Sequence, residues 1–305
     1  MEKRKKAKKR FSALTSFLLA LALLTGTLGA LPAECFAAQP EKAAFHSTYG
    51  FRLGSSAKME LQFRDKLEKN YKVNGNTYYG SQTDLSRQLR DQMVKRSDQV
   101  VLRLATDRRG LTGRSNSAAQ AREELFLGLL NDATAQRNSV SARDGDYLRW
   151  QLGSVSGVLY ADGSKNGVYY YRVIYYGLGY YTTAAEEQWV DRYVQKYVRR
   201  VDRNKMSDYD LAKKVHDDVC RATVYDMEMD SRYDYDYSAY GCLYVGRCVC
   251  QGYALAYYRL CRELGLSVRF VYSDPHEGCH AWNLVQVGGK YYYVDCTWDD
   301  TYHEG

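Results

Sequence analysis

Apolar and polar side chains alternate with a helical period in some stretches of the chain and with a strand-like pattern in others. Residues 83–96 and 118–130 carry apolar side chains at helical spacing, which predicts two helices. Branched and aromatic side chains predict strands over residues 100–104 and 168–181, and Gly177 indicates a bulge in the second strand. The first two thirds of the chain therefore mix helices with strands.

The segments around these elements carry fewer regular features. Residues 39–55 have no clear period and predict a flexible lead, whereas residues 57–71 predict an amphipathic helix. An Asn-Gly pair within residues 72–77 is a typical turn signal, and the polar run 131–146 predicts a loop.

Two helix-start signals precede the last third of the chain. Thr183 with Glu186 and Ser207 with Asp210 each place a hydroxyl side chain three positions before an acidic one, the pattern of a capping box. Apolar side chains follow each signal at a spacing of four, so we expect a helix after each. The polar run 203–205 separates the two helices.

A third helix and a pair of strands are predicted near the C-terminal end of the sequence. Residues 250–264 carry an apolar stripe, and Gly265 is suited to end the helix because glycine accepts a left-handed backbone. Residues 284–287 and 291–294 have the composition of strands, joined by the turn at Gly288-Gly289.

The first 37 residues have the three-part organisation of a secretory signal peptide. Residues 1–10 contain seven lysine or arginine side chains, residues 11–30 are apolar and uncharged, and Cys35 and Ala37 suit a cleavage site. The alternative is an uncleaved membrane anchor, although the strongly apolar part, residues 17–24, is short for a span. We therefore expect a secreted or cell-surface protein with no stable membrane span after cleavage.

Removal of this leader lowers the net charge of the chain. The whole chain has a formal net charge of +7, and residues 1–37 contribute seven basic and two acidic side chains, which leaves +2 for the mature chain. The basic character belongs mostly to the leader, so it gives no reason to expect nucleic acid as a partner.

Cysteine is concentrated at one end of the mature chain. Seven cysteines lie in the last third, and an odd number leaves at least one free thiol even where the others pair. One alternative is a metal site formed by Cys248, Cys250, Cys279, His280 and Cys296. Their spacing fits no common zinc pattern, so we assign no metal and no cofactor.

Three residues, in sequence order, supply the parts of a thiol acyl-transfer site. Cys250 opens the predicted helix 250–264, His280 precedes a predicted strand, and Asp295 follows another. A helix N-terminus and a neighbouring imidazolium both lower the pKa of a thiol, and a carboxylate holds the imidazole in one orientation. Backbone N–H groups at the helix start can stabilise the oxyanion.

The motifs around these residues resemble those of the transglutaminase-like superfamily, which shares the papain-type thiol core. The matching segments are CQGYA at 250–254, LGL at 264–266, HAWN at 280–283 and YYYVDCTWDD at 291–300. Segment 238–249 is also similar to the stretch that leads into the nucleophile in bacterial members. The resemblance covers residues 207–300, about a third of the chain.

The resemblance implies a role for each of the three residues. Cys250 is the expected nucleophile, His280 the general base and acid, and Asp295 the carboxylate that orients the histidine. Cys248 is a rival nucleophile, but Cys250 is the cysteine that precedes Gln-Gly-Tyr-Ala, as in the family.

Other titratable residues near the motifs have more than one interpretation. Asp299 and Asp300 are rivals of Asp295 for the histidine, and the sequence context Val-Asp-Cys-Thr-Trp favours Asp295. His216 belongs to no motif, and we expect it to have a packing or surface role.

The resemblance also implies the fold class and the organisation of the chain. It implies an α+β fold in which the nucleophile helix packs on an antiparallel sheet, preceded by a mixed helical and β region. We expect a signal peptide at 1–37, an N-terminal α+β region of unassigned role at 38–203 and a transglutaminase-like catalytic domain at 204–305.

The expected activity is thiol-dependent acyl transfer on amide or peptide bonds. With water as the acceptor it is a protease- or amidase-type hydrolysis at the cell surface, which we favour for an exported protein. A lysine amine as the acceptor gives protein cross-linking instead, and a non-catalytic binding module is the third alternative. The expected partner is a protein or peptide substrate, including one associated with the cell wall.

Overall fold

Two large buried clusters of side chains organise the part of the chain that the computed structural model describes, and a small third cluster comprises Tyr78, Ala105 and Tyr170. That part comprises residues 42–48, 67, 69–137, 141–227, 234–273 and 279–300, all within one compact unit, residues 40–305. The first cluster lies in the N-terminal half, and the second surrounds the helix that begins at Cys250. The predicted leader, residues 1–37, lies outside the described residues.

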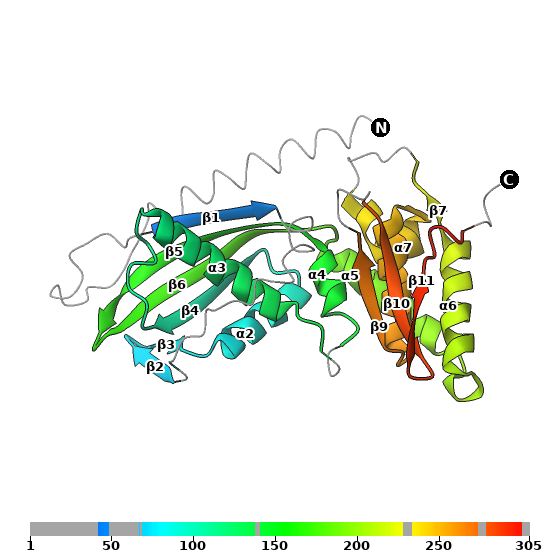
Figure 1. The fold of residues 1–305 in the computed structure, drawn as a ribbon, viewed down its shortest axis with the longest axis horizontal. Coiled ribbons are helices and arrows are strands. Elements are labelled where there is room, and N and C mark those ends of the chain that lie inside the picture. The colour runs from blue at the N-terminus through cyan, green and yellow to red at the C-terminus, as the bar shows by residue number, and fades with distance from the viewer. Residues whose placement is uncertain are drawn as a thin grey trace. The chain divides into compact units, whose positions relative to one another are not determined.

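The N-terminal half is built on a six-stranded sheet (Figure 1). In spatial order its strands are β1 (Lys42–Thr48), β5 (Leu152–Lys165), β6 (Val168–Tyr180), β4 (Gln99–Thr106), β3 (Asn76–Tyr79) and β2 (Asn70–Val73). Strands β3 and β4 pair in parallel, and the other neighbours pair antiparallel. The mixed helix and strand content predicted for this half is confirmed.

Local sequence signals explain the turns of this sheet. Asn74 and Gly75 have φ angles of 47° and 75°, the left-handed pair of a two-residue hairpin turn, as the Asn-Gly signal predicted. Asn166 and Gly167 repeat the device between β5 and β6, with φ angles of 53° and 78°. Gly177, at φ 62°, lies where the β5–β6 register shifts, which confirms the predicted bulge.

Two helices pack on this sheet, α2 (Gln82–Val94) and α3 (Asn116–Ala133). Each begins at a serine whose hydroxyl accepts a hydrogen bond from the first turn, as helix N-caps require. The approach of α3 to the sheet is close, because a Cβ at Gly157 would lie 2.2 Å from the ring of Phe126. A glycine in β5 therefore allows the helix to pack on the strand.

The C-terminal half combines three helices with a second sheet. Helices α5 (Ala184–Val198) and α6 (Asp208–Ala222) each start with the predicted capping box, and both pack on α7 (Cys250–Glu263). The sheet has the antiparallel order β11 (Lys290–Val294), β10 (Ala281–Val287) and β9 (Val268–Tyr272). The predicted α+β class, with the nucleophile helix packed on an antiparallel sheet, is confirmed.

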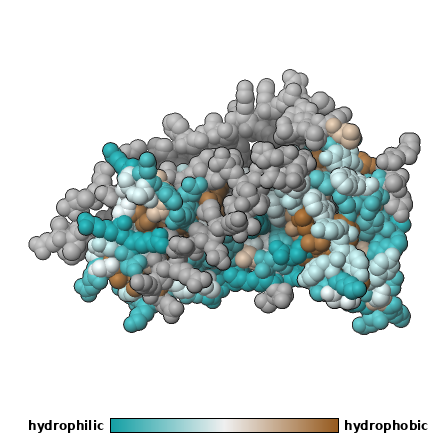
Figure 2. All heavy atoms as spheres, in the orientation of Figure 1, coloured by the Kyte–Doolittle hydropathy of each residue, from teal (hydrophilic) through white to brown (hydrophobic). Residues whose placement is uncertain are grey.

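The surface of the described residues is mostly polar on the face shown in Figure 2, and its hydrophobic areas there are small. No helix within the described ranges is both long enough and apolar enough to cross a bilayer.

Three expectations from the sequence need correction. Residues 42–48, expected in a flexible lead, form β1 and pair with β5. The helix expected over 57–71 is wrong at its end, because β2 begins at Asn70, and most of its remainder lies outside the described residues. The loop expected over 131–146 gives way at Asp146 to the short helix α4 (Asp146–Trp150).

A buried ion pair joins the two halves. Arg96, just after α2, lies 3.1 Å from the carboxylate of Glu187 on α5, and both side chains are almost fully buried. The hydroxyls of Tyr147 and Thr182 also donate to Glu187, at 3.1 and 2.7 Å. Because a buried charge is tolerated when it is paired and hydrogen-bonded, this network fixes α2 relative to α5.

Replacement of one partner of this pair tests its contribution to stability. Glu187→Gln keeps the side-chain shape but leaves the guanidinium of Arg96 buried without a counter-charge, and we expect a loss of about 3–5 kcal/mol. Asp202→Asn, whose ion pair with Lys205 is exposed, should change stability by less than about 0.5 kcal/mol. Urea unfolding followed by circular dichroism measures both. Equal unfolding midpoints for Glu187→Gln and the parent would contradict the assignment.

Candidate active site

Cys250 is the first residue of α7 and is partly exposed at the helix start. The preceding residue, Val249, caps the helix: its N–H donates to the carbonyl of Asp236 at 3.1 Å, and its own carbonyl accepts from Gly252 at 2.8 Å. The thiol therefore occupies the end of the helix where the macrodipole is positive and the first N–H groups have no partner within the helix.

Gly252 is required by the packing at this helix start. A Cβ there would lie 2.6 Å from Cβ of Cys248 and 2.9 Å from the carbonyl oxygen of Asp236. The glycine of the CQGYA motif thus reflects a close approach of segments beneath the thiol, and a larger residue would force Cys248 or Asp236 to shift.

His280 lies directly before β10 and is held by its own main chain. Its N–H donates to the hydroxyl of Ser273 at 2.8 Å, and its carbonyl accepts from the N–H of Ser273 at 2.9 Å. The imidazole stacks on two indoles, with centroid distances of 5.6 Å to Trp282 and 4.6 Å to Trp298. These contacts restrict both the position and the rotation of the ring.

Asp295 follows β11 and engages the histidine directly. Its Oδ2 lies 2.5 Å from Nε2 of His280, and its Oδ1 accepts from the N–H groups of Thr297 and Trp298 at 3.1 Å each. Because the partner of Nε2 is a carboxylate, Nε2 carries the proton and Nδ1 is the nitrogen left to exchange a proton with a thiol.

The thiol of Cys250 lies against the strand that His280 begins. Backbone N–H groups of Gln251 and Ala281 point to the sulfur, and the carboxylate of Asp295 is close enough to act on it electrostatically. The structure therefore brings together the three residues that the sequence singled out, one from the start of α7 and one from each of two strand ends.

The electrostatic state of the free thiol differs from the expectation. Burial raises the pKa of Cys250, and this effect exceeds the lowering by the N–H groups of Gln251 and Ala281. The sequence predicted a lowered pKa. Burial therefore opposes ionisation of the thiol before a substrate binds, which favours deprotonation during the reaction step.

Asn283 connects the histidine strand to the cysteine helix. Its side chain is buried, and its amide donates to the carbonyl of Ala254 on α7 at 3.1 Å and to that of Arg269 on β9 at 3.2 Å. The side chain thus fixes β10 relative to α7, and with it the separation between Cys250 and His280. The asparagine of the HAWN motif has a positioning role in this arrangement.

The N-terminal half supplies part of the support. The side-chain amide of Gln251 donates to the carbonyl of Trp150 at 2.6 Å and to that of Tyr237 at 3.1 Å. The indole of Trp150 stacks on Phe270 and Tyr272 of β9, with centroid distances of 4.8 and 5.2 Å. The residue after the candidate nucleophile is therefore anchored on the end of α4.

The rival residues have other partners. Cys248 is buried, with its sulfur 3.6 Å from the hydroxyl of Thr223. Asp299 lies 3.3 Å from Nε2 of His216, and Asp300 accepts from the hydroxyl of Tyr253 at 2.7 Å. Of the three aspartates, Asp295 is the one hydrogen-bonded to His280.

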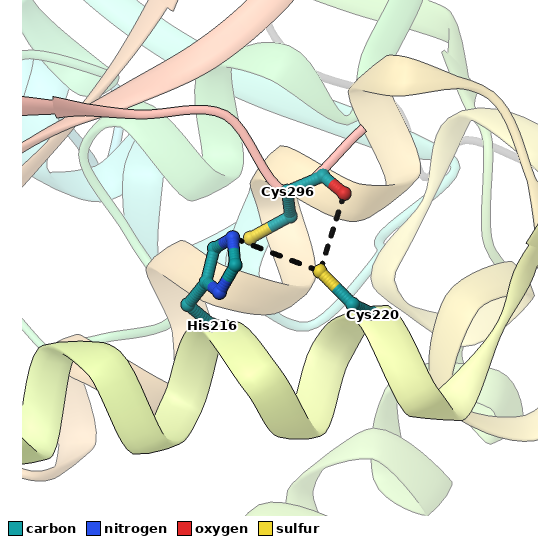
Figure 3. Close-up of side chains that lie close together, drawn as sticks. All are labelled: His216, Cys220 and Cys296. Carbon is teal, nitrogen blue, oxygen red and sulfur yellow. Dashed lines mark hydrogen bonds between the residues drawn. The ribbon is translucent and has the colours of Figure 1, made fainter. Parts of the chain in front are cut away.

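A second cysteine–histidine pair escaped the sequence interpretation. Nε2 of His216 lies 3.8 Å from Sγ of Cys220, one turn further along α6, and Cys296 completes the cluster (Figure 3). A hydrogen bond from Cys296 lowers the pKa of Cys220 to about 6, and the partnership with Cys220 raises the pKa of His216 to about 9. Cys220 is fully buried, so it cannot attack a protein substrate. The spacing of four between His216 and Cys220 was the available signal.

The cysteines of the described region are all free thiols. The metal set considered from the sequence, which included Cys250 and His280, is not formed. Among the described residues, the group of metal-ligating side chains that converges is His216, Cys220 and Cys296.

Comparisons with known proteins agree with the motifs. Residues 195–296, about a third of the chain, match the family model of the transglutaminase-like superfamily, which confirms the predicted resemblance for this segment. That superfamily performs thiol acyl transfer in general, and its members act on protein substrates. Comparison with curated proteins gave no match. A solved structure titled "Crystal structure of a TGase" aligns at 17% identity and a TM-score of 0.35, covering 66% of this chain. This chain spans 52% of the length of that structure.

The raised pKa of Cys250 makes a testable prediction about its reactivity. Iodoacetamide reacts with the thiolate, so labelling of Cys250 should rise with pH and reach half its maximum above the value of about 8.5 typical of a free thiol. The measurement uses a Cys279→Ser background, which removes an exposed thiol, and peptide mapping by mass spectrometry. Fast labelling of Cys250 at mildly acidic pH would show a preformed ion pair with His280 and contradict this account.

Proposed function

We propose that this protein is a thiol-dependent acyltransferase that hydrolyses amide or peptide bonds through Cys250, His280 and Asp295. The observation that carries the proposal is the 2.5 Å hydrogen bond between His280 and Asp295, with the thiol of Cys250 lying against Ala281. A nucleophile, a base and a residue that orients the base are the minimum set for covalent acyl transfer.

The first half of the reaction forms a thioester. Nδ1 of His280 accepts the thiol proton as Sγ of Cys250 attacks the carbonyl carbon of the substrate. The negative charge on the carbonyl oxygen develops near the N-terminus of α7, where backbone N–H groups of the helix start can donate to it. The imidazolium, held by Asp295, then donates its proton to the leaving amine as the carbon–nitrogen bond breaks.

The second half releases the acyl group. Water approaches the thioester, His280 removes its proton, and the carbon–sulfur bond breaks to give a carboxylic acid and the thiol of Cys250. The side chains of His280 and Asp295 are 16% and 17% exposed, and Cys250 is also partly exposed, so the site is open to water. This accessibility is what water as the acceptor requires, and we propose water in place of a lysine amine, the cross-linking alternative.

The superfamily and the leader-like segment each support one further part of the proposal, the substrate and the location. We propose a protein or peptide substrate, including one associated with a cell wall, because members of the superfamily act on proteins. The signal-like segment 1–37 supports action outside the cytoplasm, at the cell surface or in secreted form.

Substitution of each catalytic residue tests this function. On a panel of peptides supplied with a fluorescent primary amine, the parent should release acid or ammonia, and Cys250→Ala should have no turnover. Asp295→Asn should lower kcat by about 10⁴-fold, because the orientation and charge stabilisation of the imidazole are lost. Asp299→Asn is the matched control and should keep the parental rate, since Asp299 contacts His216 instead.

The same assay separates the alternatives. Incorporation of the amine in excess over hydrolysis would overturn water as the acceptor and leave acyl transfer intact. A ligand bound equally well by the parent and by Cys250→Ala, without turnover of any peptide, would identify a non-catalytic binding module and contradict the proposal.

A further inference from the structure

Three metal-ligating side chains converge on one point beside the candidate active site. His216 and Cys220 project from the same side of α6, one helical turn apart, and Cys296 comes from the segment after β11 (Figure 3). Their ligand atoms all lie within 4.8 Å of one another, and Nε2 of His216 is 3.8 Å from Sγ of Cys220. None of the three has a role in the proposed acyl transfer.

We propose that His216, Cys220 and Cys296 bind a zinc ion. Two thiolates and one imidazole are ligands that zinc prefers, and they disfavour magnesium and calcium, which bind oxygen. Tetrahedral zinc with ligand bonds of about 2.0–2.3 Å separates its ligand atoms by about 3.3–3.8 Å. The observed 3.8 Å between His216 and Cys220 already suits this geometry. The ion would take the place of the thiol protons, including the one that Cys220 now donates to the carbonyl of Cys296 at 3.3 Å.

The surroundings of His216 support a ligand role for Nε2. Its other ring nitrogen, Nδ1, lies 3.1 Å from Oδ1 of Asp217. A carboxylate on the far nitrogen holds the Nδ1 proton and the ring orientation, so that Nε2 can bind the metal once the ion displaces its proton, and this arrangement is typical of histidines that bind zinc. Asp217 also pairs with Lys213 at 2.6 Å, so its own position is held.

The fourth coordination position faces an open cavity. His216 and Asp299 both line a cavity of about 460 Å³ between α6 and the strands β10 and β11. Oδ2 of Asp299 lies 3.3 Å from Nε2 of His216, and the Asp299 side chain is 62% exposed. A water molecule from the cavity can therefore complete the tetrahedron, and the cavity gives the ion a route to two cysteines that are themselves buried.

The site would act on the position of the catalytic carboxylate. Cys296 is the residue after Asp295, so a zinc ion would tie the segment that holds His280 in place to α6. The proposal is independent of the acyl-transfer chemistry, because a chain without Cys250 keeps all three ligands.

Metal content tests the proposal directly. The Cys250→Ala chain, expressed with added zinc and purified without chelators, should contain about one zinc per chain by plasma mass spectrometry. His216→Ala, Cys220→Ser and Cys296→Ser should each lose most of it. Cys261→Ser is the matched control, because Cys261 is an equally buried cysteine outside the cluster, and it should keep the ion.

Three further measurements guard against loss of metal through misfolding. Asp217→Asn keeps all three ligands and should weaken zinc affinity by about 10–100-fold while the chain stays folded. Cobalt in place of zinc should give thiolate-to-metal charge-transfer absorption in the parent and lose intensity in Cys296→Ser. Chelation should lower the Tm of the parent and of Cys261→Ser.

Three outcomes would overturn the proposal. A folded parent chain that binds no zinc in a titration with zinc chloride excludes the site. Unchanged zinc content in all three ligand variants places the ion elsewhere. A Cys220–Cys296 disulfide in a non-reduced peptide map shows that the two sulfurs are joined covalently instead of binding a metal.

Discussion

The burial of α7 is the constraint on which the rest of the site depends. Every residue from Gln251 to Cys261 is buried, including the guanidinium of Arg259, which pairs with Asp191 at 2.7 Å and with Glu263 at 2.9 Å. A helix enclosed in this way cannot shift without breaking contacts to α5, α6 and the second sheet. The position of the Cys250 sulfur, at the first residue of this helix, is therefore fixed. The strand that follows His280 must pack beside it for the two side chains to meet.

Two side-chain amides hold the neighbouring elements in place relative to α7. Asn283 ties β10 to α7, so that His280 begins its strand beside the thiol, and Gln251 ties the helix start to the carbonyl of Trp150. Burial has an electrostatic consequence, since it raises the pKa of Cys250 and so opposes ionisation of the free thiol. The imidazole of His280 must therefore take the proton during attack, and its hydrogen bond to Asp295 prepares it for that step.

The order and spacing of motifs in the sequence singled out the three residues that the structure brings together. A cysteine before an apolar helix, a histidine before a strand and an aspartate after the next strand identified Cys250, His280 and Asp295, because each motif is local. The capping boxes at Thr183 and Ser207 and the Asn-Gly turn were predictable for the same reason.

What the sequence did not predict depends on distant contacts. The pKa of Cys250 follows from how many segments enclose it, which no local pattern reveals. Strand β1 has no period of its own and is defined by its pairing with β5. The approach of Cys296 to His216 joins residues 80 positions apart, so the cluster on α6 became visible when the sheet was placed against the helix.

Trapping the acyl-enzyme tests the central claim most directly. The protein would be mixed with a peptide carrying a reactive acyl group, quenched in acid and mapped by mass spectrometry. The account predicts a single hydroxylamine-sensitive thioester on Cys250, absent from His280→Ala and present at the parental level in Asp299→Asn. Acylation of Cys248 or Cys279 in place of Cys250, or no acylated cysteine with a peptide that the protein turns over, would contradict it.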